Sequence, residues 1–129
     1  MYEPELPIFL VSNEDDEIMV APTQAWAEGQ MEPPEASTGY YMVLDAAGRH
    51  GRIKIDRWTV VIDGWDEKRD IEGLRARISV YLHNRSLFVQ PNLEAAEYLR
   101  QAVQIISFQN RTLKWPKLPK WLSRVIRRT

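Results

Sequence analysis

Cysteine is absent from the 129-residue sequence. Its absence excludes disulfide bonds, thiol catalysis and zinc sites built from cysteine, and it is typical of a reducing compartment. No stretch approaches the roughly 20 consecutive apolar residues that a membrane-spanning helix needs. The N-terminal sequence MYEPELPIFL has no basic segment before its short apolar run, unlike a signal peptide. We therefore expect a cytoplasmic protein without a membrane span.

Each end of the chain also lacks charge of one sign. Residues 1–48 carry ten acids and neither lysine nor arginine, and no acid follows Arg111. All 17 basic residues lie in residues 49–129, together with the other eight acids, so the net charge of −1 hides an asymmetry. Two interpretations stay open. The asymmetry serves electrostatic recognition of a partner or of another copy, or the two parts fold together and partly neutralise each other.

The composition, 44% hydrophobic and 27% charged, is that of a soluble globular domain. Short apolar runs at 7–11 and 17–21, separated by the polar residues SNEDD, predict a β-hairpin. Residues 39–45 and 50–63 alternate in hydrophobicity and predict two or three further antiparallel strands, with Trp58, Val60 and Ile62 on one face. A short helix capped by Thr23 separates these strand segments and ends at Gly29 and the Pro33-Pro34 pair.

Helical periodicity replaces alternation in the second half. One stripe comprises Ile71, Leu74, Ile78 and Leu82, and the second, in a helix opened by Pro91-Asn92, comprises Leu93, Ala96, Leu99, Val103 and Ile106. We expect one α+β domain over residues 1–110. It comprises an N-terminal antiparallel β-sheet of about five short strands with a short helix, then two main helices. A basic tail with tryptophan and proline follows at 111–129.

The sequence contains few residues that could form a catalytic or cofactor-binding motif. His50 lies in a predicted turn or strand start, and His83 ends a predicted helix, where a cation suits the helix dipole. Neither histidine belongs to a recognisable catalytic spacing, and nucleophile, phosphate-binding and zinc-protease motifs are missing. We therefore expect no enzymatic activity and no cofactor.

Two acidic clusters are candidate surfaces. The sequence NEDDE lacks the spacing of a calcium loop, so a solvated hairpin turn is favoured over a metal site. The sequence DGWDE also reads as a turn, whose Trp65 is either packed on the core, the favoured interpretation, or exposed as an interface anchor.

The tail interleaves basic residues with Trp115, Trp121 and aliphatic residues, which is compatible with nucleic acid or an anionic surface. The slightly acidic whole chain, with a pI of about 6.1, instead favours a tail docked on the domain. The alternative function is an adaptor that binds nucleic acid or an anionic surface through this basic tail.

The first two thirds of the chain resemble small bacterial immunity proteins encoded beside polymorphic toxins. The parts that carry the resemblance are MEPPEASTGYYMVLDAAGR and LRARISVYL. The resemblance implies a non-enzymatic, cytoplasmic protein that covers the active site of one cognate toxin domain. An acidic first half suits a toxin with a basic cleft. The predicted partner-binding residues are Glu14, Asp15, Asp16 and Glu17, and secondarily Asp63, Trp65, Asp66 and Glu67.

Overall fold

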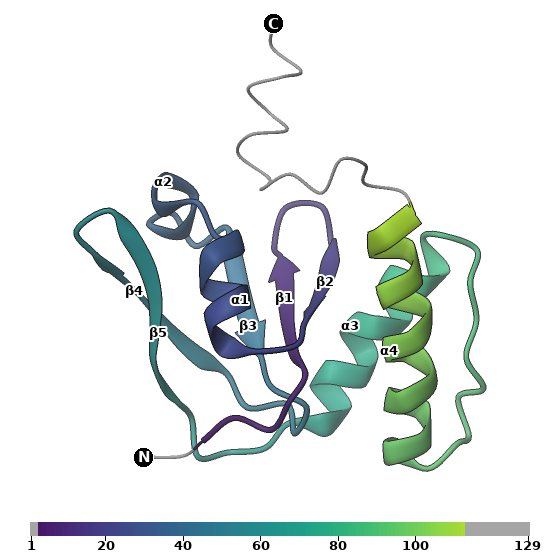
Figure 1. The fold of residues 1–129 in the computed structure, drawn as a ribbon. Coiled ribbons are helices and arrows are strands. Elements are labelled where there is room, and N and C mark those ends of the chain that lie inside the picture. Colours follow the sequence, from purple (N-terminus) through teal and green to yellow (C-terminus); the bar gives the residue numbers. More distant parts are fainter. Residues whose placement is uncertain (1–2, 113–129) are drawn as a thin grey trace, which may run out of the picture.

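The structure, a computed structural model, describes residues 3–112 (Figure 1). The described part is α+β, as predicted. Most of the predicted tail, residues 113–129, lies outside the described residues. The elements in chain order are β1 (Ile8–Ser12), β2 (Ile18–Ala21), α1 (Gln24–Gln30), α2 (Pro33–Ala36), β3 (Tyr41–Leu44), β4 (Gly51–Asp56), β5 (Thr59–Trp65), α3 (Ile71–His83) and α4 (Ala95–Thr112).

The strands form two antiparallel sheets, and this corrects the prediction of a single sheet. One sheet has the order β2-β1-β3, and the other is the β4-β5 hairpin. A single bridge between Leu44 and His50 joins them before β3 and β4 diverge. Close to this bridge, the register between β4 and β5 shifts between Gly51 and Ile53. Such an irregularity bends the strand and increases its twist.

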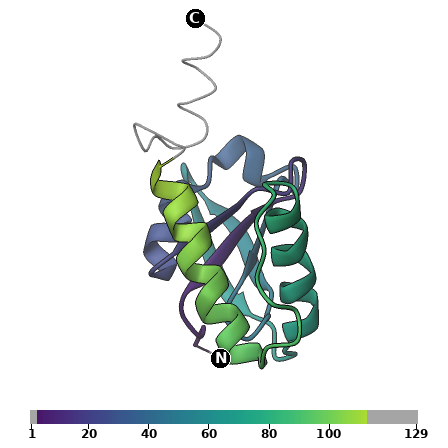
Figure 2. The same cartoon turned by 90° about the vertical axis from the view of Figure 1, so that its right-hand side faces the viewer.

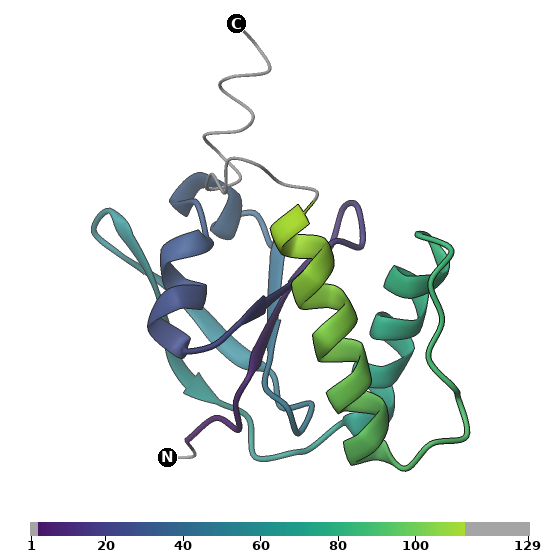
Figure 3. The ribbon, with the colours of Figure 1, turned by 45° about the vertical axis from the view of Figure 1, so that its right-hand side comes forward.

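The predicted first hairpin is confirmed, with Ile8 opposite Ala21 and Val11 opposite Ile18. All five residues of β1 are buried although alternate side chains point to opposite faces. Phe9 and Val11 join the core with α3 and α4, whereas Ile8 and Leu10 join the core with α1 and the β4-β5 hairpin. The three-stranded sheet is therefore a middle layer between two cores, as Figures 1 and 3 show.

The helices begin where local chemistry allows. The hydroxyl of Thr23 accepts from the Trp26 N–H at 3.1 Å and caps α1, as predicted. The proline pair does more than end this helix, because Pro33 opens the separate helix α2. Asp70 caps α3 by accepting from the Gly73 N–H at 2.9 Å.

The second long helix differs from its prediction in detail. It begins at Ala95, later than the Pro91-Asn92 start. The predicted stripe is confirmed at Ile106, which is buried, and at Leu93, Leu99 and Val103, which pack against the same core, whereas Ala96 is exposed. Tyr98 and Ala102, which the prediction left out, are also buried. The α3 stripe is confirmed at Leu74, Ile78 and Leu82. The two helices lie beside each other on one side of the sheet, with the segment that connects them on the outside (Figure 2).

A buried corner connects β3 to β4. Asp45 is fully buried, and its carboxylate accepts from the backbone N–H groups of Ala47 and Arg49 at 2.9 and 2.8 Å. Gly48 follows with a φ of +78°, and a Cβ there would lie 2.1 Å from the Asp70 carbonyl oxygen. Only glycine fits this position without rearrangement. The corner therefore fixes the direction in which the β4-β5 hairpin leaves the body.

Candidate functional site

The loop between β1 and β2, residues 13–17, presents the first predicted acidic cluster, and we call Glu14, Asp15 and Asp16 the acidic tip. Backbone hydrogen bonds close its base, with the Ser12 N–H donating to the Glu17 carbonyl at 2.9 Å. Asp16 adopts a φ of +54°, a left-handed conformation that Asp tolerates better than most residues. All three side chains of the acidic tip are exposed.

The loop is also attached to a neighbouring segment. The Asn13 backbone N–H donates to the Tyr40 carbonyl, and its side-chain amide donates to the Gly39 carbonyl, both at 2.8 Å. On the other side, the Asp15 carboxylate accepts from the Glu17 backbone N–H at 3.2 Å. The acidic tip is therefore held at both of its ends.

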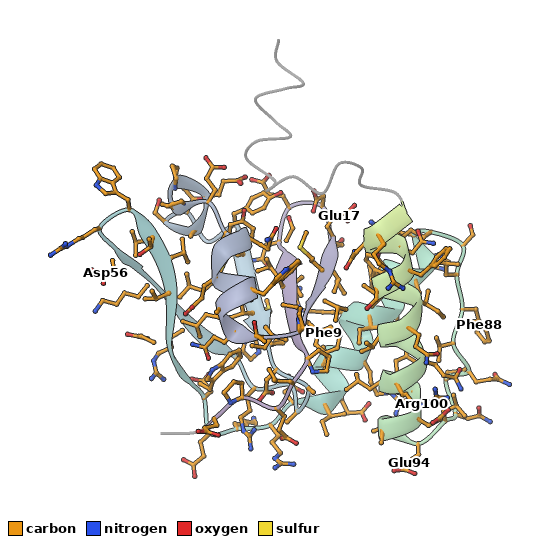
Figure 4. All side chains as sticks on the ribbon, viewed as in Figure 1. Phe9, Glu17, Asp56, Phe88, Glu94 and Arg100 are labelled. Atoms are coloured by element: carbon orange, nitrogen blue, oxygen red, sulfur yellow. The ribbon has the colours of Figure 1, made fainter. Side chains whose placement is uncertain are left out.

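Glu17 has a different environment from the acidic tip. Its carboxylate forms a salt bridge with Arg85, which follows α3, and both side chains are partly buried. The Arg85 guanidinium lies 3.8 Å from the centre of the Tyr81 ring. Burial raises the pKa of the Tyr81 phenol. Glu17 therefore attaches the β1-β2 hairpin to the end of α3. Figure 4 labels Glu17 beside the loop between β1 and β2.

Within residues 3–112, no salt bridge involves Glu14 or Asp16. Three carboxylates within three consecutive exposed positions repel one another and produce a concentrated negative potential. A cationic partner surface would relieve this repulsion. The acidic tip is therefore suited to binding a basic surface.

Other acids of the first half are neutralised inside the fold. Asp45 and Glu5 both pair with the Arg49 guanidinium at 3.2 Å, and Glu5 also lies 3.5 Å from Arg69. With the bridge from Glu17 to Arg85, the first half is partly neutralised by the second. The interpretation that the two parts compensate each other therefore holds for these acids, while Glu14 and Asp16 form none of these pairs.

Two more acids of the first half accept internal hydrogen bonds. The Glu28 carboxylate accepts from the Ile62 backbone N–H at 2.6 Å. The buried Glu35 carboxylate accepts from the Tyr41 hydroxyl at 3.1 Å. Burial, with Glu35 as a further cause, raises the pKa of Tyr41. These acids serve the fold.

The second predicted cluster is not a turn. Asp63 and Trp65 belong to β5, and only Asp66 and Glu67 lie in the following loop. Arg52 lies 3.6 Å from Asp63 and 3.7 Å from Asp66, so these two acids share one counter-ion.

Trp65 is buried, with 5% of its surface exposed. Its indole N–H donates to the Gln24 side chain at 3.1 Å. The favoured interpretation, packing on the core, is therefore confirmed for this residue. Its side chain presents almost no surface to a partner.

An exposed tryptophan occurs elsewhere, at a position that the sequence interpretation missed. Trp58 is 89% exposed, although alternation placed it on the face of Val60 and Ile62. It lies in the two-residue connection between Asp56 and Thr59, after Arg57 at a φ of +60°. The sequence did contain a signal for this turn, because the polar pair Asp56-Arg57 interrupts the apolar residues of segment 50–63. Trp58 borders an open groove of about 580 Å³ that is also lined by Met31, Pro33 and Val61.

The remaining predicted features can be placed briefly. His50 pairs with Leu44 at the start of the second sheet, and His83 is the last residue of α3, as predicted. Residues 3–112 contain no group of three metal-ligating side chains suited to a metal ion. None of the helices in this range is long and apolar enough to cross a membrane.

Comparison with known proteins gives no relative: no protein-family model, curated protein or solved structure matches the chain.

Proposed function

We propose that this chain is a non-enzymatic, cytoplasmic immunity protein that binds and neutralises a cognate bacterial toxin domain. In this proposal the acidic tip faces a basic active-site cleft of the toxin. The observation that carries the proposal is the set of three exposed carboxylates, Glu14, Asp15 and Asp16, at the end of a hairpin whose strands are largely buried.

The hairpin is well suited to present these charges. Asn13 attaches its base to the segment before β3, and Glu17 attaches it to Arg85. A loop that is already ordered loses little conformational entropy on binding. The acidic tip therefore combines charge with preorganisation.

The second acidic cluster supports the proposal less. Arg52 partly neutralises Asp63 and Asp66, and Trp65 is buried. Trp58 is the better anchor, because exposed tryptophans supply a large share of the energy in many interfaces. Both hairpin ends lie toward the same end of the molecule, with α2 between them (Figure 1). A partner at that end could contact the acidic tip and Trp58 together.

The test uses the toxin domain encoded beside this protein. The variant Glu14→Gln/Asp15→Asn/Asp16→Asn removes charge and keeps the oxygen that accepts from Glu17, and Asn tolerates the backbone at position 16. Exposed charges mainly set association rates. We expect association to slow by roughly tenfold at low salt, with a smaller effect at high salt.

The matched control is Glu3→Gln/Glu72→Gln/Glu94→Gln, which changes the net charge equally at three other exposed positions. Its association rate should stay close to that of the native protein. If both triple variants slow association equally, only net charge matters and the acidic tip is no specific contact. The absence of a toxin gene beside this one, or a toxin that the protein does not neutralise, would overturn the proposal itself.

A further inference from the structure

Two outer strand edges in this fold are closed by helical side chains. At β2, the Asn110 amide accepts from the Val20 N–H at 3.1 Å and donates to the Ile18 carbonyl at 3.2 Å. At β5, Glu28 accepts from the Ile62 N–H and Gln24 donates to the Ile62 carbonyl at 3.0 Å. In both places a helix replaces the hydrogen bonds of an additional strand.

Beyond the bridge between His50 and Leu44, no such closure of the outer edge of β4 occurs among residues 3–112. Opposite residues of an antiparallel pair either bond to each other or both face away. Because the backbone groups of Ile62 bond to α1, those of its partner Ile53 face away from β5, and so do those of Ile55 two residues later. No hydrogen bond from another described element reaches the backbone of Ile53 or Ile55.

We propose that β4 pairs with β4 of a second copy, antiparallel across a two-fold axis, so that the two hairpins form one four-stranded sheet. Unpaired strand edges are templates for such addition. Both strands are identical, so the contact is isologous and closes at a dimer. Only alternate residues of β4, among them Ile53 and Ile55, direct their backbone N–H and C=O groups toward a second copy. Two central registers are therefore possible, with Ile55 opposite Ile55 or with Ile53 opposite Ile55.

Charge distinguishes these two registers. With Ile55 opposite Ile55, Lys54 of each copy lies directly opposite Asp56 of the other, giving two attractive pairs. The other register places Lys54 opposite Lys54, and like charges directly opposite destabilise a sheet. Ile55 is 36% exposed and gains an apolar partner in the first register. The proposal is therefore the dimer centred on Ile55. Figure 4 shows Asp56 on the hairpin, away from the helices.

The experiment is sedimentation velocity of the full chain from about 10 µM to about 1 mM, a range chosen because so small an interface predicts weak association. We expect a concentration-dependent dimer. The variant Ile55→Pro removes an N–H that bonds nothing inside the protomer, so it should leave the unfolding temperature nearly unchanged and abolish the dimer.

Charge exchange tests the register. Lys54→Asp alone places acids opposite each other and should weaken the dimer at least about tenfold. Lys54→Asp/Asp56→Lys together should restore the native dissociation constant. The other register does not allow this recovery, because the lysine introduced at position 56 would then face Arg52. A native protein that stays monomeric throughout, or a dimer that survives Ile55→Pro, overturns the proposal. A double variant as weak as the single one overturns the register.

Discussion

The three-stranded sheet and the β4-β5 hairpin are both antiparallel, yet they differ in how much of each is covered. In the first sheet, β1 is buried on both faces, and Asn110 closes the edge at β2. In the hairpin, four of the six residues of β4 are exposed. An antiparallel strand pattern alone therefore does not decide whether a strand is buried in the fold or exposed at its surface. The three-stranded sheet forms the interior of the fold, whereas β4 of the hairpin is exposed at its surface.

The largest expected effect is a loss of stability on truncating a core residue, and it tests the division between the covered sheet and the exposed hairpin. Phe9→Ala removes a fully buried ring between β1 and helices α3 and α4, and should destabilise the protein by about 3–5 kcal/mol. The matched variant Ile55→Ala lies in the hairpin and should lose less than about 1 kcal/mol, because its side chain is already partly exposed. Urea unfolding measures both changes. Similar losses for the two variants would remove the distinction between body and hairpin.

A smaller effect concerns the closed edge. Asn110→Ala removes both hydrogen bonds to β2 and should lower the free energy of unfolding by about 1–3 kcal/mol. Gln104→Ala, an exposed position on the same helix, is the control and should stay within about 0.5 kcal/mol of the native protein. Equal values for the two variants would mean that the amide of Asn110 does not stabilise the edge.

Trp58, at the end of the exposed hairpin, tests the hairpin half of this contrast. Trp58→Ala should change stability by less than about 0.5 kcal/mol, because the side chain is almost fully exposed. Under the proposed function it should speed dissociation from the toxin, because an anchor lost from an interface acts mainly on the dissociation rate. Thermal unfolding and binding kinetics together test this expectation. A large drop in stability would place Trp58 with the core instead.

The smallest effect lies on the surface of α4. Hydrogen bonds from Arg100, and then from Gln101, lower the pKa of Glu97 from 4.5 to about 2. A lowered folded-state pKa stabilises the protein above pH 4.5, and this contribution disappears as the pH falls toward 2. The native protein should therefore exceed Glu97→Gln slightly in stability near pH 5, and the gap should shrink on acidification. Urea unfolding across this range checks it, and a gap independent of pH contradicts it.

The sequence predicted local features better than distant ones. Thr23 as a helix cap and the first hairpin follow from nearby residues, and both are confirmed. The division into two sheets depends on the corner at Asp45, whose partners include Glu5, 40 positions away. Nothing in the alternation of residues 50–63 encodes where β3 and β4 separate.

The candidate site shows the same limit. Exposure of the acidic tip follows from its polarity, so the sequence identified this surface. It did not separate Glu17 from its neighbours, because Arg85 lies 68 residues further along the chain. It also missed the exposure of Trp58, because the two-residue turn that carries this tryptophan contains no glycine to mark it. The alternating hydrophobicity of residues 50–63 fits one long strand as well as two short ones. Only the pairing of Asp56 with Thr59 shows that the chain turns at residues 57 and 58.

Hydrogen exchange tests whether, within residues 3–112, helical side chains close the edges of β2 and β5 and leave the outer edge of β4 open. At low protein concentration, the amide of Ile62, which donates to Glu28, should be protected, whereas the amides of Ile53 and Ile55 should exchange rapidly. At high concentration the amide of Ile55 should become protected as copies pair. Equal protection of the amides of Ile53, Ile55 and Ile62 at low concentration would show that the outer edge of β4 is not open.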